Sequence, residues 1–202
     1  MSLPLLDGLV HLAVASGCGG TTLGLQCVRR ELESGGRAIW VSPESPNPER
    51  FRQVLHSIPL STLSKLHLFP CGDAISTGVD SAGRLSNTLD TSLIVIDDWT
   101  SRSGHIDPMA ASAISELVKS MPENPPNLLV ISALYEDASG EETWKVRGRG
   151  KLEECGCRTW LLTVEEGGHQ RRQLDTGQEK LSLILGDGGF EARSHSSSST
   201  KP

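Results

Sequence analysis

A glycine-rich segment follows the first apolar run of the chain, and it combines backbone amides with hydroxyl side chains at a defined spacing. In a phosphate-binding loop of the form G-x-x-x-x-G-K-[ST], main-chain N–H groups surround the phosphates at a helix N-terminus, a lysine adds a charge and a hydroxyl holds magnesium. Gly20 and Thr22 stand where this pattern needs them, whereas Ala15 replaces its first glycine and Thr21 replaces its lysine. The segment therefore predicts a phosphate-binding loop without its lysine, made of Ser16, Gly17, Cys18, Gly19, Gly20, Thr21 and Thr22. The open alternative is a strand-to-helix turn that needs glycines only for its tight geometry.

Two carboxylates form a second candidate group. The run Ser92 to Asp98 (SLIVIDD) is continuously apolar until it ends in Asp97 and Asp98. In folds with a phosphate-binding loop, a strand of this kind places an aspartate against the magnesium ion. Thr22 and Asp97 are thus the predicted metal ligands, with Asp98 the less favoured neighbour. The alternative is a pair of polar residues where a buried strand meets solvent.

The elements that must position these residues alternate between strands and helices. Short apolar runs predict strands at 9–15, 37–42, 66–69, 92–98 and 128–133, and helical spacing predicts helices over 21–32, 47–55 and 110–121. Three further strands, at 159–164, 171–174 and 181–185, are separated by glycine-containing turns. Residues 71–90 are interpreted as loop or weak helix, and 136–151 as irregular. The expected fold is α/β, a mainly parallel twisted sheet flanked by helices that closes in a C-terminal antiparallel meander.

Composition limits the class of protein. The 202 residues are 37% hydrophobic and 22% charged, which suits one core domain over 1–193 followed by a disordered Ser-rich tail over 194–202. The chain has no long apolar stretch and no basic, cleavable start, so we expect a cytoplasmic protein without membrane contact. Its five cysteines are scattered, which predicts reduced thiols and no structural metal. The net charge of −6 restricts nucleic-acid binding to a local basic patch.

A family resemblance rests on the loop, the LIVIDD strand and the stretch RAIWVSPESPNPERFRQVL. Together they resemble the RecA/RadA recombinase superfamily, and within it the archaeal RadB-like paralogues, over roughly residues 8–191. The resemblance implies a RecA-like P-loop NTPase core. In that family an acidic residue after the second strand polarises the attacking water, and Glu44 occupies this place, so it is the catalytic candidate. One residue is deleted between Glu44 and Pro48 relative to the family pattern.

Two departures from that family bear on activity. Ala133 and Leu134 stand where the family has a polar γ-phosphate sensor, and Thr21 stands in place of the loop lysine. Loss of one such electrostatic donor typically costs about 10²–10³ in rate. We therefore expect weak binding of ATP and Mg²⁺, with little or no hydrolysis.

A basic segment lies where the resemblance implies a DNA-facing loop. Trp144 precedes four cations within seven residues, which can neutralise phosphates beside one stacking surface: Lys145, Arg147, Arg149 and Lys151. The alternative is a solvated flexible loop.

Three functions remain open. The leading prediction is an accessory of homologous recombination and DNA repair that binds a recombinase of the RadA type and single-stranded DNA. The alternatives are a slow ATPase stimulated by DNA or a partner through a non-standard loop, and a KaiC-like regulatory protein of RecA fold.

Overall fold

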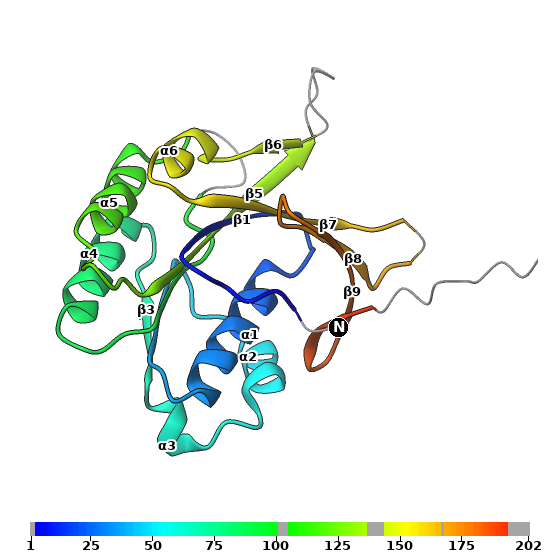
Figure 1. Ribbon diagram of the computed structural model, residues 1–202, viewed down its shortest axis with the longest axis horizontal. Helices are drawn as coiled ribbons and strands as arrows, with labels where there is room; N and C mark the ends of the chain where they lie inside the picture. The colour runs from blue at the N-terminus through cyan, green and yellow to red at the C-terminus, as the bar shows by residue number, and fades with distance from the viewer. Residues whose placement is uncertain (1–2, 101–104, 137–143, 167, 194–202) are drawn as a thin grey trace, which may run out of the picture.

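The computed structural model describes residues 3–100, 105–136, 144–166 and 168–193. The strands of these residues form one sheet in the order β10-β9-β8-β7-β1-β5-β4-β2-β3, and β6 pairs with β5 off this path. The expected α/β architecture is confirmed (Figure 1). The strands are β1 (Leu9–Ala15), β2 (Ala38–Ser42), β3 (Leu66–Pro70), β4 (Leu93–Ile96), β5 (Asn127–Glu136), β6 (Trp144–Val146), β7 (Arg158–Val164), β8 (Arg171–Asp175), β9 (Lys180–Gly186) and β10 (Gly189–Ala192).

The parallel half of the sheet is covered on both faces. Helices α1 (Gly20–Glu33), α2 (Pro48–Leu55) and α3 (Leu60–Leu63) lie on one face, and α4 (Ile75–Ser86), α5 (Pro108–Lys119) and α6 (Arg149–Glu154) lie on the other. Alternate residues of one strand therefore enter different cores, as Trp40 and Val41 of β2 do. This explains why β4, and β2 as far as Ser42, are apolar: every position of both strands is buried.

Two segments are more regular than the sequence predicted. The expectation that 136–151 is irregular was wrong for its second half, because Trp144–Val146 pairs antiparallel with β5 and Arg149–Glu154 forms α6. A three-residue strand and a six-residue helix that buries only Leu152 are too short to show a hydrophobic period. Residues 75–86 form a full helix, α4, with Ile75, Val79 and Ala82 buried. Residues 137–143 and the predicted tail over 194–202 lie outside the described residues.

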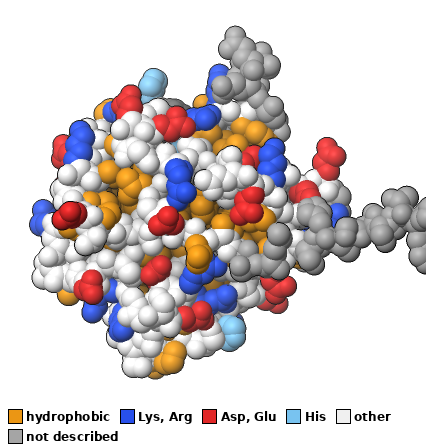
Figure 2. Space-filling model, in the orientation of Figure 1, with side chains coloured by type: hydrophobic (Ala, Val, Ile, Leu, Met, Phe, Trp, Pro, Cys, Tyr) orange, Lys and Arg blue, Asp and Glu red, His pale blue; other side chains and the backbone are white. Residues whose placement is uncertain are grey.

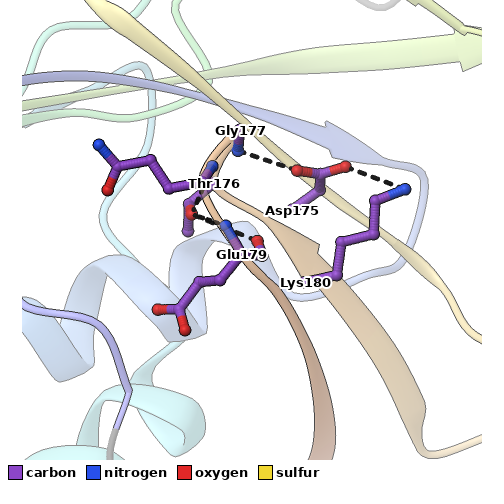
Figure 3. Close-up of polar contacts among 6 residues, drawn as sticks. Asp175, Thr176, Gly177, Glu179 and Lys180 are labelled. Carbon is purple, nitrogen blue, oxygen red and sulfur yellow. Dashed lines mark hydrogen bonds and ion pairs between the residues drawn. The ribbon is translucent and has the colours of Figure 1, made fainter.

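The C-terminal strands continue the sheet past β1. Strand β7 runs parallel to β1, and β8, β9 and β10 then follow antiparallel. The turn between β8 and β9 is fixed by its own polar groups (Figure 3): Asp175 accepts a hydrogen bond from the Gly177 amide at 2.8 Å and forms an ion pair with Lys180 at 3.3 Å. These contacts hold the register in which Arg172 of β8 faces Leu183 of β9.

The last hairpin docks on α1 through a buried amide. The Gln26 side chain donates to the Phe190 carbonyl at 3.0 Å and accepts from the Phe190 amide at 2.7 Å. Gly189 precedes this contact with φ of 112°, and a Cβ there would lie 2.4 Å from the Gln26 side chain. The close approach therefore requires glycine, and it fixes β10 beside the middle of α1.

Replacing Gln26 with Met should destabilise the protein without changing its net charge. Met nearly matches the shape of Gln but cannot pair with the buried amide and carbonyl of Phe190, and each buried unsatisfied group carries a desolvation penalty. We expect the free energy of unfolding to fall by about 2–4 kcal/mol, measured by urea denaturation. Gln178→Met in the exposed β8–β9 turn is the matched control. Equal unfolding midpoints for the two variants would refute the docking role of Gln26.

Candidate functional site

The loop between β1 and α1 has the tight backbone of a strand-to-helix turn. Gly17 and Gly19 adopt φ of 71° and 92°, which L side chains rarely tolerate, and the Cys18 amide donates to the Ala15 carbonyl at 3.0 Å. At Gly20 a Cβ would lie 2.8 Å from the side chain of Val14. Each glycine is therefore required by the backbone or by close packing, and α1 begins at the last of them.

Residues of the C-terminal strands contact the loop. The guanidinium of Arg172, a buried residue of β8, donates to the Gly17 carbonyl at 3.3 Å and to two carbonyls of its own hairpin. The ring of Phe190 lies 3.0 Å from the point where a Cβ of Gly19 would stand. These contacts fix the position of the loop through protein groups alone.

Thr21 joins the loop to the end of β4. Its hydroxyl donates to Asp97 Oδ2 at 2.8 Å. Burial raises the pKa of Asp97 to about 6; the Thr21 hydrogen bond acts against this shift, and the charge of Asp98 adds to it. Asp98 itself has φ of 52° and is exposed. The residue at the lysine position thus contacts the predicted metal-side carboxylate directly.

A cavity of about 600 Å³ opens between the loop and the carboxyl ends of β2, β4 and β5. In open α/β sheets this edge is where ligands bind, and the volume is within the usual range for small-molecule sites. The cavity brings most of the predicted residues together: Gly17, Cys18, Gly19, Gly20, Thr21, Glu44 and Asp97.

Two predicted residues are placed differently. Ser16 is exposed and does not line the cavity, and Thr22 is buried within α1 and does not line it either. The pairing of Thr22 with Asp97 around magnesium remains a prediction. Among the described residues, no cluster of three or more His, Cys, Asp or Glu side chains is arranged to hold a metal ion.

Sequence reasoning missed Arg50 and Ser132 as cavity residues. Arg50 lies in the first turn of α2, whose N-cap Asn47 accepts from the Glu49 and Arg50 amides at 3.0 Å. The Pro-Glu-Arg motif predicted the start of this helix but not that Arg50 lines the cavity. Ser132, in the middle of β5, contacts the buried His11 at 2.5 Å; it stands in an apolar run that gave no sign of a polar role.

The four cations of the basic segment do not share one loop. Lys145 is exposed on β6, Arg147 is buried, and Arg149 and Lys151 are exposed on α6. Arg149 also forms an ion pair with Glu153 at 2.8 Å. On the face shown in Figure 2, Lys and Arg side chains are interspersed with Asp and Glu. Any contact with phosphates on that face therefore depends on local groups rather than on a broad basic surface.

Solved structures with the same fold are proteins of RecA type. A RadB recombinase matches with a TM-score of 0.68 and 20% identity, over 94% of this chain and 93% of that one. A DnaB-like replicative helicase matches at 0.64 and 13%, over 91% of this chain and 57% of the helicase chain. A KaiC-like protein from the archaeon Pyrococcus horikoshii matches at 0.63 and 16%, over 93% and 90%. The expected RecA-like fold is thus confirmed.

Other comparisons add no family. No protein-family model and no curated protein sequence matches the chain. Within the described residues, no helix combines the length and apolar character needed to span a membrane.

Replacing Asp97 with Asn should stabilise the protein at neutral pH. Burial raises the pKa of the folded-state carboxyl from 3.8 to about 6, so the folded state binds this proton more tightly than the unfolded state. That stabilising contribution is complete below about pH 4 and is lost as the pH rises through 6. Asn still accepts from Thr21 and carries no charge, so we expect the free energy of unfolding to rise by about 2–3 kcal/mol at pH 7.5.

Urea denaturation of the variant and the wild type between pH 4 and 7.5 measures this effect. Burial lowers the pKa of His11 to about 4, so its protonation destabilises both proteins equally as the pH falls below 6.5, and it cancels in their difference. Asp98→Asn at the exposed neighbouring position is the matched control. A gain that does not depend on pH, or an equal gain in the control, would contradict the burial argument.

Proposed function

We propose that the protein is a RadB-like accessory of homologous recombination and DNA repair, which binds nucleotide phosphates with little or no hydrolysis. The observation that carries this proposal is the glycine loop, held opposite Asp97 at the edge of a RecA-like sheet with Thr21 in the lysine position. The shape of a nucleotide site is retained while its principal charge is missing. The proposed partners are a recombinase of the RadA type and single-stranded DNA, in keeping with the RecA-like fold.

The residues of the cleft fit the phosphates of ATP better than they fit its metal ion. The loop ends at the N-terminus of a 14-residue helix, whose free amides and dipole favour an anion. Asp97 would be the carboxylate on the magnesium side, yet its Oδ2 already accepts from Thr21. Magnesium, when bound, neutralises charge on the phosphate oxygens. Binding therefore depends mainly on the loop amides, and we expect it to be weak.

A slow ATPase is the second candidate, because Glu44 lines the same cavity as the loop. In this proposal its exposed carboxylate accepts a proton from a water molecule near a bound phosphate. This function requires a cation supplied by a partner protein, alone or bound to DNA. ATP hydrolysis would therefore rise when the partner is added. The KaiC-like alternative shares the fold and predicts nucleotide binding without any affinity for DNA.

Restoring the lysine should reveal the nucleotide site. In Thr21→Lys an ammonium enters the cleft beside the loop amides, and calorimetric titration should show Mg·ATP binding at least about tenfold tighter than in the wild type. Hydrolysis should rise by about 10²–10³, because one preorganised donor contributes that much to a charged transition state. Ser16→Lys adds the same charge at an exposed position of the loop that does not line the cavity, and should produce neither effect. An unchanged Thr21→Lys would refute the proposed nucleotide site.

Single-stranded DNA binding should depend on the exposed cations of β6 and α6. Changing Lys145, Arg149 and Lys151 together to Gln should weaken binding and reduce the slope of log K against log salt by about 2, since each lost phosphate contact removes about 0.7. Arg147 is left intact because it is buried. The control removes three exposed cations from α2, α4 and α5: Arg52, Arg84 and Lys119. Equal losses in the two triple variants would mean that net charge alone matters, and no DNA binding by the wild type would favour the KaiC-like alternative.

A further inference from the structure

The cleft has more negative than positive side chains. Three carboxylates line it, those of Glu44, Asp97 and Asp98, and Arg50 is the one cation among its described lining residues. A bound di- or triphosphate would face these carboxylates without the loop lysine, because Thr21 supplies only a neutral hydroxyl. A charge-assisted donor is therefore needed among the lining residues if phosphates are to bind.

Arg50 is held in place at two points but keeps part of its guanidinium available. Its amide donates to the side chain of Asn47 at 3.0 Å, which fixes the backbone of the first turn of α2. Its Nη1 donates to the carbonyls of Gly186 and Asp187 in the β9–β10 turn, at 3.1 and 3.2 Å. These acceptors are neutral, and Arg50 forms no ion pair with any described carboxylate. Its charge is thus not neutralised by the protein.

We infer that Arg50 is the phosphate-contacting cation of this cleft and takes over the charge that the loop lacks. The guanidinium is a planar fork with five donors. With Nη1 on the turn, the edge formed by Nε and Nη2 can donate to one phosphate oxygen pair without breaking the contact to Gly186. This inference rests on the proposed nucleotide binding, and it places the compensating charge within the same chain rather than on a partner.

The competing explanation is that Arg50 only fastens the β9–β10 turn to α2. A fastening role would affect the fold of the cleft and therefore every ligand in it. A phosphate contact affects only ligands that carry phosphate. Inorganic pyrophosphate and adenosine, which share no chemical group, separate the two roles.

The experiment titrates both probes into the wild type, Arg50→Gln and Arg52→Gln. Arg52 lies on the same helix, is exposed and does not line the cavity, so it controls for net charge. We expect Arg50→Gln to bind pyrophosphate at least about tenfold more weakly, the loss typical of a hydrogen bond to a charged group, and to bind adenosine as the wild type does. Arg52→Gln should match the wild type with both probes.

A third variant guards against misfolding. Arg50→Lys keeps the charge but loses the fork, so it should show the same selective weakening toward pyrophosphate in smaller degree. Unchanged pyrophosphate binding in Arg50→Gln or Arg50→Lys overturns the inference and leaves the proposed function standing. Parallel losses for both probes, or a loss in Arg52→Gln, also overturn it. If the wild type binds neither pyrophosphate nor ATP, the proposed function and the inference fail together.

Discussion

The hydrogen bond between Thr21 and Asp97 is the contact on which the chemistry of the cleft depends. It joins the loop after β1 to the end of β4, two segments separated by 76 positions in the chain. A lysine in place of Thr21 would set an ammonium near a buried carboxylate and favour its ionised form. The hydroxyl offers only a hydrogen bond, so burial keeps the pKa of Asp97 at about 6. The cleft therefore has a neutral hydroxyl, and not a cation, beside the buried carboxylate of Asp97.

The loop keeps its conformation because contacts within the protein hold it. Arg172 binds the Gly17 carbonyl from behind, Phe190 packs on Gly19, and the backbone of Gly20 lies against Val14. None of these contacts involves the side chain at position 21 or a ligand. Substitution at position 21 can therefore remove charge without collapsing the turn. The C-terminal strands therefore contribute to the site, because β8 and β10 supply the side chains that contact the loop.

The sequence alone predicted the parallel strands and the loop. It did not predict features that depend on contacts between residues far apart in the chain. Strand β1 matches its predicted bounds because a short apolar run ends in glycines, and β4 follows from four consecutive buried residues. Helix α4 was obscured by its glycines and serines, although the apolar spacing of Ile75, Val79 and Ala82 was present. The role of Arg50 depends on a turn 136 residues away, and no local pattern encodes that proximity. Ser16 and Thr22 matched a motif by position, yet their side chains do not line the cavity.

Two residues that line the cavity from β5, Ser132 and Ala133, are hydrogen-bonded to Arg147 of the basic segment. Ser132 lines the cavity from β5, donates to the Arg147 carbonyl at 3.1 Å and contacts His11 Nε2 at 2.5 Å. The Ser132 hydroxyl has one proton and donates it to the Arg147 carbonyl. His11 Nε2 must therefore carry the proton of the hydrogen bond between His11 and Ser132. His11 Nδ1 is then a bare, buried acceptor without a partner, which agrees with a pKa that burial lowers to about 4 and a neutral ring at physiological pH. Arg147, which follows β6, is therefore hydrogen-bonded to two residues that line the cavity, through the Ser132 hydroxyl and the Ala133 carbonyl.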